Sequence, residues 1–170
     1  MRIDLSNFFR QDEGVLRMEG EVEADGSTID FGEYVIDRPI TYKGEIHRTG
    51  YSYLVTIHIN YSYKAKCARC LVDISREMET TFNGKIERNR NKEEEDGKDL
   101  EVIYLEENEL DVAKYVLMEV ASSLPMRVLC DEDCKGICPQ CGKNLNEDKC
   151  DCVIEDIDPR LEKLKDFFTE

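Results

Sequence analysis

Hydrophobic and polar residues alternate along residues 51–65, where every second side chain is apolar or aromatic. A period of two places these side chains on one face of a strand, and such a strand has one buried face in an antiparallel sheet. The alternation resumes over residues 71–86, so we predict a long hairpin with Cys67 and Cys70 at or near its tip. The apolar positions of the first strand are Tyr51, Tyr53, Val55, Ile57, Ile59, Tyr61 and Tyr63.

Shorter patterns predict the rest of the sheet. We expect strands at residues 1–6, 15–24, 39–48 and 100–105. Residues 87–99 contain no apolar side chain, and a segment that buries no surface cannot offset the entropy of ordering. We therefore interpret them as a mobile loop.

Two segments have the features of helices. Residues 110–124 carry a broad apolar stripe at helical spacing, and Pro125 ends the pattern. A second helix is predicted to begin after Asp158 as N-cap, with Pro159 at its first position. The expected fold is α+β: an antiparallel, partly barrel-like sheet with the 110–124 helix packed on it, a cysteine-rich zinc-binding module and a short C-terminal helix. We expect residues 1–129 to form the sheet domain, with the module and the second helix in residues 130–170 packed on it as one unit.

Cysteine is the residue type with the clearest chemical signal. The chain has eight, of which six lie between Cys130 and Cys152 and two form a C-x-x-C motif at Cys67 and Cys70. Cys138-Pro139-Gln140-Cys141-Gly142 has the form of a zinc knuckle, in which backbone amides point at the sulfurs. Eight thiolates fill two tetrahedral Zn²⁺ sites with none left over.

The division of the cysteines between two sites follows from spacing. We prefer a first site of Cys67, Cys70, Cys130 and Cys134 and a second of Cys138, Cys141, Cys150 and Cys152, because the second set is closed locally. A zinc ribbon that gathers Cys67, Cys70, Cys138 and Cys141 remains an alternative. An iron–sulfur cluster also accepts four thiolates, although paired knuckles with glycine are more typical of zinc.

Charge limits the class of partner. The chain of 170 residues is 41% hydrophobic, enough for a modest core, and its 23 basic and 38 acidic residues give a net charge of −15. This charge repels polyanions at long range and favours basic partners. The sequence shows no export signal and no apolar run of membrane-spanning length, so we expect a cytoplasmic protein without a membrane partner, in which cysteines are more often metal ligands than disulfides.

Other kinds of site have less support. His47 and His58 lie on strand patterns without a nearby nucleophile, and common nucleotide-binding and hydrolase motifs are absent from the sequence. We expect no catalytic residue and no small-molecule substrate. Thiol–disulfide exchange usually places C-x-x-C at a helix start rather than between antiparallel strands. A direct RNA-binding module is the main alternative function, and it would use the basic residues beside the cysteines: Lys64, Lys66, Arg69, Lys135 and Lys143.

Several motifs together resemble a known bacterial family. They are Cys67-x-Arg69-Cys70, Leu124-Pro125, Cys130-x-x-Asp133-Cys134-Lys135-Gly136-Ile137-Cys138-Pro139-x-Cys141-Gly142-x-Asn144-Leu145-Asn146, and Asp158-Pro159-Arg160-Leu161-x-x-Leu164. In this order they are similar to the YceD family.

The resemblance implies a non-enzymatic, cytosolic factor needed for accumulation of large-subunit ribosomal RNA. Joined to the acidic charge, it leads us to expect a basic ribosomal protein or a pre-ribosomal particle as the partner. Some members of the family lack the second cysteine set, which supports the preferred division.

Overall fold

The chain divides into two units, and the computed structural model describes residues 1–10, 14–22, 29–30, 32–50, 52–87, 100–105 and 107–152. The first, called here the sheet unit, contains residues 1–66 and 73–128. The second, called here the cysteine unit, contains residues 67–72 and the chain from residue 129 onward. The predicted helix after Asp158 lies outside the described residues, as do residues 88–99 of the predicted loop.

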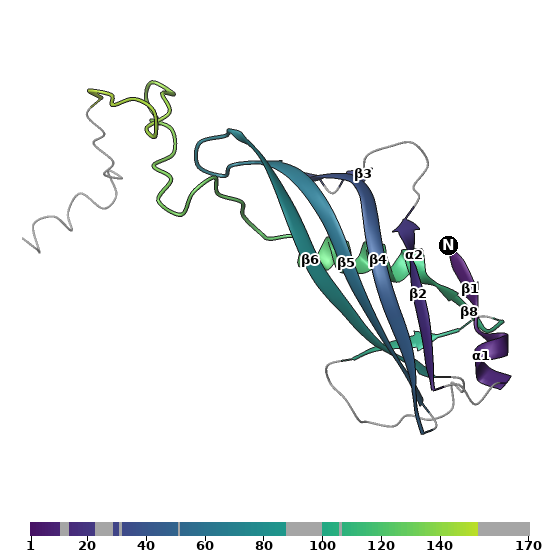
Figure 1. Cartoon of the computed structure of the whole chain (residues 1–170). Helices are drawn as coiled ribbons and strands as arrows, with labels where there is room; N and C mark the ends of the chain where they lie inside the picture. The colour runs from purple at the N-terminus through teal and green to yellow at the C-terminus, as the bar shows by residue number, and fades with distance from the viewer. Residues whose placement is uncertain are drawn as a thin grey trace, which may run out of the picture. The chain divides into compact units, whose positions relative to one another are not determined.

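A six-stranded sheet forms most of the sheet unit (Figure 1). Its strands run in the order β2-β4-β5-β6-β7, and β3 pairs with β4. The strands are β2 (Val15–Val22), β3 (Ile29–Asp30), β4 (Val35–Thr49), β5 (Ser52–Lys66), β6 (Asp73–Glu87) and β7 (Glu101–Tyr104). The sheet is open, with β2 and β7 at the two ends of this order, so the expected barrel-like closure is not confirmed.

Strand direction follows the prediction with one exception. The pairs β2–β4, β4–β5 and β5–β6 are antiparallel, and β5 meets β6 over almost its whole length, from Tyr53 opposite Ile86 to Lys66 opposite Asp73. By contrast, β7 runs parallel to β6. A parallel neighbour requires a connection of about a dozen residues or more, and residues 88–100 between the two strands provide that length.

Alternating burial confirms the predicted pattern over residues 52–65, whereas Tyr51 lies outside the described residues. Along β5, Ile57 and Ile59 are fully buried, while the residues between and beside them, Thr56, His58 and Asn60, are partly or fully exposed. The buried aromatic residues Tyr53, Tyr61 and Tyr63 lie on the same face as the isoleucines. The sheet therefore has one face toward the core and one polar face.

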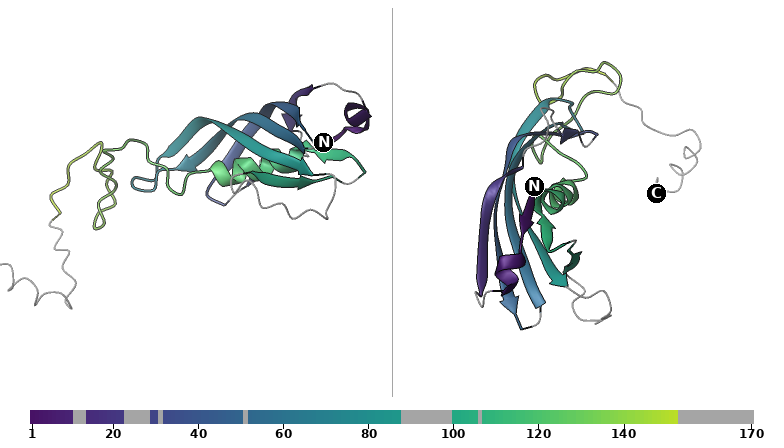
Figure 2. Two further views of the ribbon diagram at one scale, coloured as in Figure 1. Left: turned by 90° about the horizontal axis from the view of Figure 1, so that it is seen from below. Right: turned by 90° about the vertical axis from the view of Figure 1, so that its right-hand side faces the viewer.

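Helix α2 (Val112–Ser123) packs on the core face, and Figure 2 shows the curved sheet beside it. Two residues of the helix, Val116 and Val120, are fully buried. At its end, the hydroxyls of Tyr61 and Ser123 lie 2.8 Å apart, and Thr80 donates a hydrogen bond to Glu119. The predicted packed helix is thus present. No helix in the described ranges is both long and apolar enough to cross a bilayer.

The predicted bounds of the N-terminal strand at residues 1–6 and the predicted start of the 110–124 helix are wrong. Residues 1–6 contain only a short β1 (Arg2–Asp4), followed by the helix α1 (Ser6–Arg10), where the Asp4 carboxylate accepts a hydrogen bond from the Ser6 amide. Strand β1 pairs antiparallel with β8 (Glu109–Asp111). Leu110 therefore belongs to β8, and α2 begins two residues later with Asp111 as its N-cap.

Candidate metal centre

The first cysteine pair lies in the turn between two long strands. Strand β5 ends at Lys66 and β6 begins at Asp73, so residues 67–72 connect them. Within the turn, the Cys67 amide donates to the Val72 carbonyl and the Leu71 amide to the Cys67 carbonyl, both at 2.9 Å. Leu71 takes a left-handed conformation with φ of 63°. This tight turn holds Cys67 and Cys70 side by side in the cysteine unit.

Two cysteines from the later part of the chain join this pair. The sulfur atoms of Cys67, Cys70, Cys130 and Cys134, called here site 1, all lie within 4.8 Å of one another. Cys67 Sγ is 3.8 Å from Cys134 Sγ, and Cys70 Sγ is 3.5 Å from Cys130 Sγ. Three of the four side chains are buried, and Cys130 is exposed. All four are free cysteines.

Backbone amides and neighbouring sulfurs set the electrostatics of site 1. Burial raises the pKa of Cys67, but hydrogen bonds from backbone amides, first those of Cys70 and Cys130, lower that pKa to about 6 overall. The neighbouring sulfurs of Cys134 and Cys70 raise the pKa of Cys130 to about 12. Crowded thiols resist losing all their protons, because each new thiolate repels the next. A bound dication removes this obstacle by attracting every thiolate.

Arg69 connects, through hydrogen bonds, the two segments that contribute cysteines to site 1. Its guanidinium Nη1 donates to the Glu132 carbonyl at 3.1 Å and to the Cys134 carbonyl at 2.9 Å. Its own carbonyl accepts a hydrogen bond from the Ile137 amide. The sequence alone predicts Arg69 as one of the basic residues available to bind phosphate. In the structure, its guanidinium instead donates to backbone oxygens. The spacing of the cysteines gave no signal for this contact.

The remaining cysteines form a second set. The sulfurs of Cys138, Cys141, Cys150 and Cys152, called here site 2, also lie within 4.8 Å of one another. In the knuckle, the Cys138 amide donates to the Lys143 carbonyl and the Gly142 amide to the Cys138 carbonyl, both at 2.8 Å. Gly142 has φ of 72°, a conformation that glycine adopts without strain. The backbone amides of Cys141 and Gln140 lower the pKa of Cys138 to about 6, and the sulfur of Cys141 is the main cause that raises the pKa of Cys152 to about 12.

The structure therefore brings together the two sets that spacing favoured. The alternative ribbon, which combines Cys67 and Cys70 with Cys138 and Cys141, is not the grouping found. The geometry also suits one ion in each set. With Zn–S bonds of about 2.3 Å, four sulfurs at the corners of a tetrahedron lie about 3.8 Å apart. A [4Fe–4S] cluster binds each thiolate through a different iron, so its sulfurs stand farther apart than sulfurs that share one ion.

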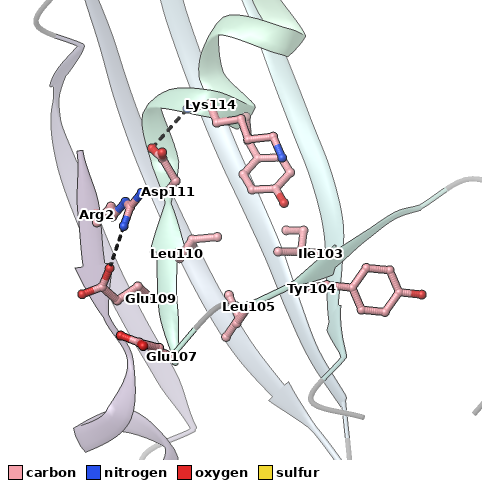
Figure 3. A pocket seen from close by; sticks show the side chains of 10 residues that line it. Arg2, Ile103, Tyr104, Leu105, Glu107, Glu109, Leu110, Asp111 and Lys114 are labelled. Carbon is pink, nitrogen blue, oxygen red and sulfur yellow. Dashed lines mark hydrogen bonds and ion pairs between the residues drawn. The ribbon is translucent and has the colours of Figure 1, made fainter. Parts of the chain in front are cut away.

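A cavity of about 580 Å³ lies in the sheet unit, among β7, β8 and the start of α2 (Figure 3). Several of its charged groups have partners within the protein. Arg2 pairs with Glu109 at 3.4 Å, and Asp111 accepts a hydrogen bond from the Lys114 amide at 3.4 Å. These carboxylates stabilise the N-terminal strand pair and the helix start, which gives them structural roles.

The two histidines lie on the sheet, as expected. His47 Nε2 is 3.0 Å from Glu45 Oε2, and His58 Nδ1 is 3.0 Å from Thr81 Oγ1. Each is engaged with a polar side chain of its own or a neighbouring strand. Among the described residues, these contacts join neither histidine to a serine or cysteine nucleophile.

Comparison with known proteins adds an independent observation. Residues 55–168 match the family model described as large ribosomal RNA subunit accumulation protein YceD. Over 53 residues the chain is 42% identical to a chloroplastic large ribosomal RNA subunit accumulation protein YCED homolog 1 of Arabidopsis thaliana, covering 31% of this chain and 16% of that protein. Over 111 residues it is 29% identical to an uncharacterized protein of Mycobacterium tuberculosis, covering 65% of this chain and 53% of that protein. A search of solved structures finds no significant match.

Proposed function

The chain belongs to the YceD family, and from this premise we propose that it is a non-enzymatic, zinc-binding factor for accumulation of large-subunit ribosomal RNA. It acts by binding a basic ribosomal protein or a pre-ribosomal particle. The family name supports the ribosomal role, and the chain spans only part of the relatives it matches. The observation that carries the choice of partner is the net charge of −15.

Zinc has a structural role in this proposal. Site 1 holds Zn²⁺ with Cys67, Cys70, Cys130 and Cys134, and site 2 holds it with Cys138, Cys141, Cys150 and Cys152. Four-thiolate sites leave no open coordination position, so the ions brace the fold and supply no reactive water. The thiols remain available as ligands in a reducing compartment, and we assign the protein to the cytoplasm on this ground.

Charge in the cysteine unit favours a basic partner. Its described residues carry four basic and six acidic side chains. A Zn²⁺ ion held by four thiolates is itself a dianion, so loading both sites makes this unit more negative. Ribosomal proteins are rich in lysine and arginine, and an acidic surface attracts them while it repels free RNA.

Direct RNA binding is the second candidate, and the structure weakens its main support. Of the five basic residues near the cysteines, Lys64 pairs with Asp37 at 2.9 Å and Arg69 donates to backbone carbonyls. Phosphate binding by zinc modules depends on basic side chains that face the nucleic acid together.

Two titrations separate these functions. The zinc-loaded protein is titrated with purified large-subunit ribosomal RNA and, separately, with the total protein fraction of the large subunit, at low and at moderate salt. We expect retention of one or more ribosomal proteins that weakens as salt rises, because exposed charges are screened beyond about 8 Å at physiological ionic strength. Zinc content is measured on the same preparations by mass spectrometry of the metal.

The outcomes are distinct. Tight binding to bare RNA with no retained ribosomal protein would refute the proposed partner and support the RNA-binding module. A preparation purified under reducing conditions that contains iron in place of zinc would refute the metal assignment while leaving the partner open to the same test. Lysozyme, a basic protein from outside the ribosome, serves as the control for nonspecific attraction by charge.

A further inference from the structure

Asn146 makes a contact that connects the two cysteine sites. Its side-chain amide Nδ2 donates to the sulfur of Cys134, in site 1, at 3.4 Å. Its Oδ1 accepts a hydrogen bond from the Lys135 amide at 2.8 Å, next to that cysteine. Yet Asn146 belongs to the segment between Cys141 and Cys150, both in site 2. The residue therefore contacts one site and is carried by the loop of the other.

The orientation of this side chain is fixed by several further hydrogen bonds. Asn144 Oδ1 accepts from both the backbone amide of Asn146, at 3.1 Å, and its Nδ2, at 2.8 Å. Asn144 Nδ2 in turn donates to Glu147 at 2.8 Å. On the other side, the Leu145 amide donates to the Gly136 carbonyl at 2.9 Å. These contacts hold the amide hydrogen toward Cys134.

We propose that Asn146 is a positioning residue for site 1 and that, through it, the ion in site 2 stabilises the ion in site 1. This inference rests on the proposed zinc binding. A hydrogen bond to a ligating thiolate orients the sulfur and spreads its negative charge, and loss of such a partner typically weakens metal binding by 10- to 100-fold. An ion in site 2 ties down both ends of the segment that carries Asn146, because Cys141 and Cys150 flank it. Without that ion, the segment is less restrained and the hydrogen bond to Cys134 is populated less.

The test compares Asn146→Asp with the wild type. The aspartate has nearly the same shape and keeps an acceptor for the Lys135 amide, but it replaces the donor to sulfur with a carboxylate oxygen. Zinc release to a chelating dye is followed over time. Cys150→Ser disrupts site 2, so the phase that is missing in this variant belongs to site 2 and the phase that remains, whatever its rate, belongs to site 1. Asn146→Ala is measured as well, and the control is Lys149→Ala, an exposed residue of the same segment. We expect release from site 1 to be 10- to 100-fold faster in both Asn146 variants and unchanged in Lys149→Ala.

A spectroscopic readout separates positioning from general loosening. With Co²⁺ in place of zinc, the sulfur-to-cobalt charge-transfer band of site 1 reports the electron density on its thiolates. Loss of the amide donor in Asn146→Ala is expected to shift this band to lower energy at unchanged metal stoichiometry. An unshifted band together with an unchanged release rate would overturn the role of Asn146.

Coupling is tested by combining substitutions. If site 2 acts through Asn146, then Asn146→Asp has a smaller effect on site 1 in the Cys150→Ser background than in the wild type. Equal fold-changes in the two backgrounds would overturn the coupling. A wild-type protein that binds no metal would overturn both this inference and the proposed zinc binding, whereas two bound ions with no effect of Asn146 would overturn this inference alone.

Discussion

At the scale of single residues, the cysteine unit depends on side chains that are not ligands. Arg69 joins the knuckle of residues 67–72 to the loop that contains Cys130 and Cys134 through two hydrogen bonds from one nitrogen. A lysine at this position keeps the charge but has a single, strongly hydrated ammonium in place of the planar guanidinium. The role of Arg69 is therefore sensitive to shape as well as to charge.

Replacement of Arg69 by lysine is predicted to weaken site 1. We expect zinc release from that site to accelerate and the thermal midpoint of the zinc-loaded protein to fall, because the carbonyls of Glu132 and Cys134 lose their common donor. Release kinetics and thermal unfolding are measured beside Lys135→Ala, an exposed basic residue in the adjacent loop. If Arg69→Lys released zinc no faster and unfolded at no lower temperature than Lys135→Ala, the structural role of Arg69 would be refuted.

Sequence spacing could predict the cysteine sets but not the residues that support them. Cys138 and Cys141 lie in a knuckle whose form is local, and the total of eight cysteines suggested two sets of four. Arg69, in contrast, donates to a residue 63 positions later, and no local pattern encodes that pairing. In the sequence Asn146 stands out only as part of a family motif, because its contact with Cys134 depends on how the intervening turn folds.

At the scale of elements, strands with a long alternation of polar and apolar residues could be predicted, and short segments could not. Strands β5 and β6 each have 15 residues, enough for the two-residue period to stand out. Helix α1 has five residues and β8 has three, which is too few for a period to be recognised. The parallel direction of β7 also left no mark in the sequence, because alternation shows which side chains are buried but not which way the neighbouring strand runs.

The two cysteine sites are predicted to differ in their effect on stability. Cys67→Ser breaks a site that joins segments about sixty residues apart, as between Cys70 and Cys130. Cys150→Ser breaks one that closes a short segment after Cys141. The entropy of closing a loop costs about 0.6 kcal/mol more for each doubling of its length, so site 1 restricts the unfolded chain more. We expect the larger loss of thermal midpoint in Cys67→Ser, with Cys150→Ser mainly loosening the chain after Cys141. Equal losses, measured by calorimetry on zinc-loaded proteins, would contradict the proposed division of roles.

At the scale of the whole molecule, the dominant property is the surplus of acidic residues. A net charge of −15 creates a field that extends as far as the salt allows. The screening length is about 30 Å at 0.01 M salt and about 8 Å at physiological ionic strength. Salt therefore changes which charges a partner senses, from those of the whole chain to those beside its docking surface.

This dependence leads to a prediction about where a basic partner docks. Two double variants each remove two negative charges: Glu132→Gln with Asp133→Asn in the cysteine unit, and Glu77→Gln with Glu79→Gln on β6. All four side chains are exposed.

At low salt we expect both variants to slow association with a ribosomal protein recovered in the binding test by similar factors, because long-range attraction depends on total charge. At physiological salt we expect only the cysteine-unit variant to remain slower, since the proposed dianionic zinc sites would attract a basic surface to this unit. Association and dissociation rates are measured separately, and the change should lie mainly in association. A persistent effect of the β6 variant alone would place the docking surface on the sheet, and the cysteine unit would then be left with a purely structural role.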